Sequence, residues 1–188
     1  MIVYHSSAPL LVSILFVSVV STACINNFAV QELNTKAKLY LDEGNYQEAI
    51  ERLKSSIDLD NTIFETHYNL AVAYTQAEDY LNAIDAYKKA IKLDDSVPDA
   101  YYSLAVAQGN LAVDLKNGNV RLSEDGKLFV PSLEVLSEES NYKPSKDILE
   151  RIQSLHSEVV ANYEIYLEKA PDAPDADEVR AKIAELKK

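Results

Sequence analysis

The sequence lacks residues on which several classes of protein depend. Its 188 residues include one cysteine, which excludes an internal disulfide framework and any zinc site built on cysteines. Basic residues are few, 18 Lys and Arg against 30 Asp and Glu, and the formal net charge is −12. Nucleic-acid binding requires Lys and Arg to displace counterions from phosphates, so the composition argues against a nucleic-acid partner. The acidic balance also disfavours electrostatic adhesion of the domain to anionic lipid.

Sequence patterns of enzymes and cofactor sites are missing as well. The four glycines form no glycine-rich phosphate loop, and no His-Glu metal-binding helix motif occurs. The acidic segments around Gly118 and Gly126 do not have the spacing of a calcium loop. His67 and His156 lie far apart in the pattern, and we interpret His67 as a packed core residue rather than a ligand. We therefore expect no enzymatic activity, no cofactor, no metal and no small-molecule substrate.

The N-terminal segment, 1–23, contains no Asp, Glu, Lys or Arg. Positions 8–20 are apolar except for two serines, which fits the hydrophobic region of a signal peptide and is short for a membrane-spanning helix. Small residues at 21–23 precede Cys24. This arrangement resembles the lipobox of bacterial lipoproteins, and the resemblance implies cleavage before Cys24 and lipid attachment to it. We expect a signal peptide over residues 1–23 and a membrane-anchored lipoprotein of the bacterial cell envelope, facing the periplasm or the exterior.

Two other interpretations of the leader stay open. Ser21 stands where lipoproteins prefer a large aliphatic residue, and the small residues at 21–23 would also suit the ordinary signal peptidase. That cleavage would give a soluble periplasmic or secreted protein. An uncleaved membrane anchor is the third interpretation, and all three place the protein outside the cytoplasm.

An internal repeat follows the leader. The stretch that begins at Ala37 aligns with the stretch that begins at Ala71. A third copy begins at the same offset, with Leu104 and Ala105. We call the offset from Ala37 to Ala71 the repeat period. The residues that agree at this shift include Tyr40 and Tyr74, Tyr46 and Tyr80, Ala49 and Ala83, and Ile50 and Ile84. Small residues at fixed positions, with tyrosines beside them, predict stacked pairs of antiparallel helices.

The segments EGNYQEAI, AEDYLNAI, YNLAVAY and YSLAVAQ resemble the turn and helix signatures of the tetratricopeptide repeat (TPR) family. The resemblance covers residues 30–110 and implies an all-α solenoid of about three helix-turn-helix repeats. The expected organisation is a short tether at 24–29, repeats at 30–63, 64–97 and 98–110 continued at 159–173, an insertion at 111–158, and a capping helix at 174–188.

The insertion has a pattern of its own. Alternating apolar residues predict a β-hairpin in which Leu122 pairs with Leu128 and Val120 with Val130, around a turn at Gly126. A long helix is expected to start after Ser145 and to run to Ala170, with its first half receiving the hairpin.

In TPR proteins the first helices of the repeats line a concave groove that binds peptides. The resemblance implies that the groove-facing residues here are Tyr68, Asn69, Val72 and Thr75 on one helix and Tyr102, Val106 and Gln108 on the next, with Glu65 and Asp99 at the rim. This set lacks the basic residues with which chaperone-binding members hold an acidic tail. We expect an apolar or aromatic peptide with flanking basic residues. The alternatives are that the insertion fills the groove or that the tyrosines only pack.

The sequence therefore predicts a non-enzymatic protein–protein interaction scaffold or adaptor with a protein or peptide partner. Its attachment to the membrane would come from the lipid on Cys24. Two alternative functions stay open, namely a pilotin-like assembly factor for an envelope secretion or pilus complex, and a regulatory subunit of an envelope enzyme.

Overall fold

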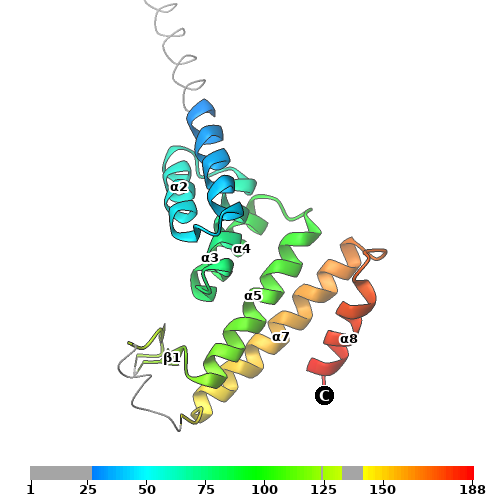
Figure 1. Ribbon diagram of the computed structural model, residues 1–188. Coiled ribbons are helices and arrows are strands. Elements are labelled where there is room, and N and C mark those ends of the chain that lie inside the picture. The colour runs from blue at the N-terminus through cyan, green and yellow to red at the C-terminus, as the bar shows by residue number, and fades with distance from the viewer. Residues whose placement is uncertain (1–26, 124, 133–141) are drawn as a thin grey trace, which may run out of the picture.

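The computed structural model describes residues 27–123, 125–132 and 142–188, and the expected signal segment and Cys24 lie outside these ranges. The described chain folds into seven helices and a two-stranded sheet (Figure 1). The first helix occupies residues 27–42, so residues 27–29 of the expected tether are already helical. The other elements are α2 (Tyr46–Leu59), α3 (Phe64–Gln76), α4 (Tyr80–Leu93), α5 (Pro98–Asn117), β1 (Arg121–Leu122), β2 (Leu128–Phe129), α7 (Lys146–Lys169) and α8 (Ala176–Leu186).

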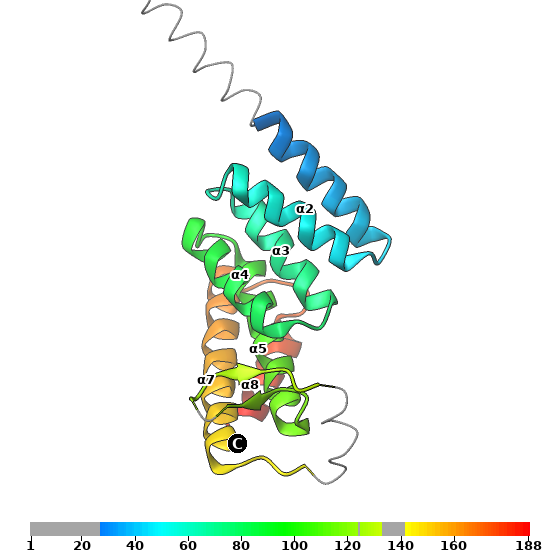
Figure 2. The ribbon, with the colours of Figure 1, turned by 90° about the vertical axis from the view of Figure 1, so that its left-hand side faces the viewer.

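The helices stack in the order of the sequence, as a solenoid requires. The first helix pairs with α2, α3 with α4, and α5 with α7, while α8 packs on the last pair (Figures 1 and 2). Each element contacts mainly its neighbours along the chain. The fold is therefore a TPR-like solenoid, as the repeat period predicts.

The period reappears in the backbone of the turns. Gly44 and Glu78, which are one period apart, both have a positive φ, 76° and 58°. The amides that follow them bond in the same way, Asn45 to the Tyr40 carbonyl and Asp79 to the Tyr74 carbonyl. These bonds satisfy carbonyls left free at the helix ends. The two copies of the repeat therefore turn by the same local geometry.

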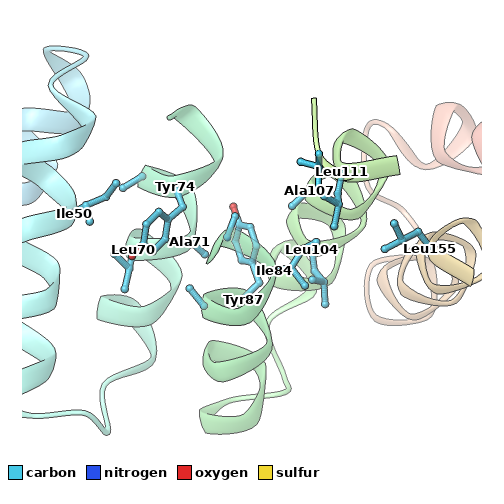
Figure 3. Close-up of a cluster of buried hydrophobic side chains, with 14 of the residues drawn as sticks. Ile50, Leu70, Ala71, Tyr74, Ile84, Tyr87, Leu104, Ala107, Leu111 and Leu155 are labelled. Carbon is cyan, nitrogen blue, oxygen red and sulfur yellow. The ribbon is translucent and has the colours of Figure 1, made fainter. Parts of the chain in front are cut away.

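The core combines small and aromatic side chains. Five alanines at repeated positions have no solvent exposure, namely Ala37, Ala49, Ala71, Ala83 and Ala105. They let helices approach closely, and Tyr74 and Tyr87 fill the space beside them (Figure 3). His67 is also buried, and its Nε2 donates to the Asn61 carbonyl at 3.0 Å, as expected of a packed core histidine.

The third pair is longer than the first two. Helix α5 has 20 residues and α7 has 24, against 13 or 14 for α2, α3 and α4. Helix α5 does not end where the period is lost but continues past Gly109 to Asn117, where Gly118 follows with a φ of +81°. Much of the segment that the sequence marks as an insertion therefore lengthens both helices of one pair. Ser145 begins α7 by accepting a hydrogen bond from the Ile148 amide.

A small β-hairpin lies in the connection between α5 and α7 (Figure 2). Leu122 stands opposite Leu128, and Gly126 has a φ of +79°. Both leucines are partly buried and pack against the main core. Val120 and Val130, which the sequence pairs as well, lie beyond the two-residue strands. Val120 is buried in the core, whereas Val130 is 68% exposed.

Candidate functional site

A cavity of about 490 Å³ opens between the first helix and α3. We call it the first pocket. Its lining residues are Lys38, Leu41, Asp42, Tyr46, Asn69, Val72 and Gln76. The sequence places two of them, Asn69 and Val72, in the expected groove. The other five are additions from the structure.

Helical spacing brings these side chains to one face. On α3, Asn69, Val72 and Gln76 are separated by three and then four positions, so they project from the same side of the helix. Lys38 and Asp42 stand one period before Val72 and Gln76, so they occupy the same repeat positions on the preceding helix. The period could therefore have identified Lys38 from the predicted Val72, whereas Asp42 follows only from Gln76, which the structure adds.

The first pocket joins an apolar floor to polar groups that have no partner in the part of the chain that the structure describes. Leu41 and Val72 are partly buried. The side chains of Lys38, Asn69 and Gln76 make no hydrogen bond or ion pair within the described ranges of the chain. Asp42 is likewise unpaired there. Such groups can form hydrogen bonds and ion pairs with a ligand without first breaking internal ones.

Tyr68 closes the wall between α3 and α5. Its ring stacks on Phe64 at 5.6 Å and meets Tyr87 edge-on at 5.7 Å. Its hydroxyl lies 3.3 Å from the Ser103 hydroxyl of α5. The half-buried Tyr68 therefore packs between helices, next to the first pocket but not among its lining residues.

Tyr102 belongs to the other end of the solenoid. Its ring centroid lies 5.6 Å from that of Tyr163 and 5.2 Å from that of Tyr166, both on α7. The Lys182 ammonium of α8 approaches the Tyr102 ring at 6.0 Å. Tyr102 is therefore packed under the last two helices, away from the first pocket.

Val106 lines a second cavity, of about 360 Å³, between α5, α7 and α8. We call it the second pocket. Helix α8 has 11 residues and is much shorter than α5 and α7, so the hollow lies beside its last residues. The lining residues are Ala105, Val106, Gly109, Asn110, Val159, Tyr163, Lys182, Glu185 and Leu186.

Helix α8 is held in place by polar contacts with α7. The Tyr166 hydroxyl donates to an Asp175 carboxylate oxygen at 2.5 Å, and this bond raises the pKa of Tyr166 to about 12. Lys187 pairs with Glu164 at 2.7 Å. These contacts fix the wall that α8 contributes to the second pocket.

Gln108 does not face the groove, which corrects the expectation from the sequence. It is 1% exposed and points to α7, where its amide nitrogen donates to Glu158 at 2.6 Å. Its amide oxygen accepts from Asn162 at 2.8 Å. Thr75 also has an internal partner, because its hydroxyl donates to the Ala71 carbonyl of the same helix.

The part of the chain that the structure describes contains no group of three or more His, Cys, Asp or Glu side chains placed to hold a metal ion. Within those same ranges, no helix has the length and the apolar character needed to cross a bilayer.

Comparison with known proteins identifies the repeats. Residues 37–77 match the family described as TPR repeat, and residues 64–96 match the family described as Tetratricopeptide repeat. No curated protein matches the chain.

Solved structures with a similar fold are TPR domains and a secretion chaperone. The first TPR of Spaghetti (RPAP3), bound to the HSP90 peptide SRMEEVD, is 20% identical in sequence and has a TM-score of 0.57. The match covers 85% of this chain and 94% of the RPAP3 chain. The second TPR domain of human RPAP3, in complex with the HSP70 peptide SGPTIEEVD, is 17% identical and has a TM-score of 0.58. That match covers 87% of this chain and 98% of the RPAP3 domain. The type III secretion translocator chaperone SycD of Yersinia enterocolitica is 13% identical and has a TM-score of 0.55. That match covers 84% of this chain and 83% of SycD. Residues 37–96 are therefore tetratricopeptide repeats, set in a TPR-like helical solenoid.

Proposed function

We propose that the protein is a lipid-anchored adaptor of the bacterial envelope that binds an apolar or aromatic peptide segment in the groove along its first helices. The observation that carries this proposal is the first pocket, where Leu41 and Val72 form an apolar floor among polar side chains that are unpaired within the described ranges. Ligand sites combine apolar lining with a few polar groups in this way. Two of the similar structures are complexes with peptides, which supports a peptide as the ligand.

The charges near the groove favour a basic partner. Asp42 lines the first pocket, and Glu65 and Asp99 lie exposed in the first turns of α3 and α5. None of these carboxylates forms an ion pair within the described residues, and Lys38 is the one cation among the lining residues. Opposite charges on a partner would steer its approach and fix its register. We therefore expect Lys or Arg beside the apolar anchor, and weak binding of acidic tails.

The anchor in this proposal is the lipid on Cys24. Residue 27 is already helical, so at most three residues, 24–26, would separate the described helix from the lipid. Three extended residues span at most about 10 Å. The repeats would therefore be held close to the bilayer, where they could meet membrane proteins or the segments next to them.

Peptide binding is tested with a substitution that places a negative charge in the apolar floor of the first pocket. The full-length protein and its Val72→Asp variant are titrated against labelled peptides that carry a Leu or Phe beside Lys or Arg. Val130→Asp is the matched control because Val130 is 68% exposed on the hairpin and lines neither pocket. We expect Val72→Asp to weaken binding at least about tenfold and the control to leave it unchanged. Equal binding by all three proteins would refute the assignment of this groove.

The anchor is tested separately by intact mass. The full-length gene and its Cys24→Ser variant are expressed in a bacterium. The intact mass of the protein is then measured in the membrane fraction and in the soluble fraction by mass spectrometry. The expected wild-type mass corresponds to residues 24–188 with acyl chains, and the variant should lose those chains. An unlipidated 24–188 product, or an uncleaved chain in the membrane, would replace the lipid anchor by one of the other two interpretations of the leader.

A further inference from the structure

The two pockets occupy the same positions of successive repeats. Val106 and Asn110 in the second pocket stand one period after Val72 and Gln76 in the first. These positions lie on the same face of α3 and α5, because the two helices are copies of one repeat element. The second pocket is therefore a continuation of the same groove rather than an unrelated hollow.

A filled stretch of wall separates the pockets. Tyr68 spans α3 and α5 through its contacts with Phe64 and Ser103, and neither cavity includes it. The first pocket lies between the first helix and α3, whereas the second lies between α5 and α8. A chain that follows the groove would thus pass from the first pocket over the packed Tyr68 to the second pocket.

The separation sets the length of a ligand that reaches both. Packed helices lie about 8–10 Å apart, and the pockets are two helix steps from each other, so their centres are separated by roughly 16–20 Å. An extended chain rises by about 3.3 Å per residue. Two side chains that enter the two pockets would therefore be about five to six residues apart.

The unpaired charges favour basic residues between those two side chains. Glu185 at the second pocket forms no ion pair within the described ranges, as is also true of Asp42, Glu65 and Asp99. The cation of the second pocket, Lys182, is already paired with Glu178 at 2.9 Å. Among the residues that the structure describes along the groove, unpaired carboxylates therefore outnumber the one unpaired lysine, Lys38.

We propose that the groove holds two apolar side chains of one extended segment, five to six residues apart, with at least one Lys or Arg between them. This inference rests on the proposed peptide binding and adds the spacing of the motif. The first pocket takes one side chain over Leu41 and Val72, and the second takes the other against Val106 and Tyr163. Because the two contacts are made by one chain, the second contact forms at a high effective concentration.

The experiment is a series of labelled peptides with two leucines separated by two to ten residues of a Gly-Ser-Lys spacer. Binding to the full-length protein is measured by fluorescence anisotropy, beside peptides with one leucine. We expect the affinity to be highest at a separation of five to six residues and at least about tenfold above that of the single-leucine peptide. In Val106→Asp the maximum should disappear, while the single-leucine peptide should still bind through the first pocket.

A second variant keeps the test informative if Val106→Asp unfolds. Asn110→Arg places a positive charge on a partly exposed lining residue of the second pocket and should remove the same maximum. Val130→Asp is again the control, and circular dichroism verifies that each variant is folded. Affinity that is independent of the leucine separation, or unchanged in both second-pocket variants, would overturn the two-pocket inference and leave the proposed function standing. A wild-type protein that binds no peptide of the series would overturn both.

Discussion

In the first two helix pairs, polar side chains on the groove face, such as Lys38 and Asn69, have no hydrogen-bond or ion-pair partner among the described residues. In the third pair the helices are longer and much of the polar chemistry is internal. There, Gln108 bonds to α7, and Tyr166 bonds to the turn before α8. Internal polar bonds also occur in the first two pairs, where the Asn34 amide nitrogen donates to Ser56 and Thr66, so the two regions differ in how many polar side chains face the groove rather than in kind.

The largest expected effects on the free energy of unfolding come from Leu→Ala substitutions that leave a cavity in the core of each region. Leu53 on α2 and Leu155 on α7 are almost completely buried, 0% and 1% exposed. Leu53→Ala and Leu155→Ala should each lower the free energy of unfolding by about 3 kcal/mol. Because repeats interact mainly with their neighbours, the damage should stay local.

Hydrogen exchange measured by mass spectrometry distinguishes the two variants. Leu53→Ala should speed exchange most in the first helix and α2, and Leu155→Ala should speed it most in α5 and α7. Leu39→Ala is the control, because Leu39 is 57% exposed and its truncation should change stability by less than about 0.5 kcal/mol. Equal acceleration along the whole chain in both variants would mean that the solenoid unfolds as one unit.

The next effect concerns the buried amide of the third pair. Gln108→Leu would leave Glu158 and Asn162 without their bonds to it and should lower the free energy of unfolding by about 2 kcal/mol. Gln76→Leu makes the same chemical change on the groove face, where the amide is exposed and has no partner among the described residues. Chemical denaturation should show little change for that control. A similar loss in both variants would remove the contrast between internal and free polar groups.

The position of Gln108 also shows what the sequence could and could not predict. Val106 and Gln108 are two residues apart, which is a rotation of about 200° around a helix, so they cannot face the same side. The repeat period predicts a buried position for Gln108, because Gln108 stands one period after Tyr74, a core residue. Applying the period to the predicted groove residues also leads from Val72 to Lys38 and from Thr75 to Leu41, two lining residues that the groove prediction omits.

The period itself predicts the paired helices and their turns, because small residues recur where helices touch. Loss of the period, however, does not mark the end of a helix. Residues 110–117 contain no Gly or Pro, and Gly118 provides the left-handed residue that ends α5. Those local signals were sufficient to extend the helix. The hollow beside α8 depends on relative helix lengths in space, which no local pattern specifies.

A smaller effect tests how firmly α8 is held. The bond to Asp175 raises the pKa of Tyr166 to about 12, above the value of about 10 in an unfolded chain. Folding thus favours the protonated phenol, and its stabilisation is complete below pH of about 10 and is lost as the pH rises to about 12. Tyr166→Phe should lower the free energy of unfolding by about 1 kcal/mol at pH 8.

The difference between wild type and Tyr166→Phe should shrink in urea titrations at pH 11.5. Tyr46→Phe is the control, since the Tyr46 hydroxyl makes no hydrogen bond among the described residues, and it should behave as wild type at both pH values. A difference that stays constant between pH 8 and pH 11.5 would show that the bond to Asp175 contributes nothing to the stability.

The smallest effect compares the two turns of the first two pairs. Gly44 and Glu78 occupy the same repeat position with positive φ, which glycine adopts without steric cost and a glutamate adopts only with strain from its Cβ. Glu78→Gly should therefore raise the free energy of unfolding by about 0.5–1 kcal/mol, and Gly44→Glu should lower it by about 1 kcal/mol. A Cβ at Gly44 would meet only the Tyr46 hydroxyl, at 4.0 Å, so the loss would come from the backbone rather than from a clash. Opposite changes in thermal melting would show that the two turns are energetically equivalent, whereas a loss of stability in Glu78→Gly would show that the glutamate side chain supports the second turn.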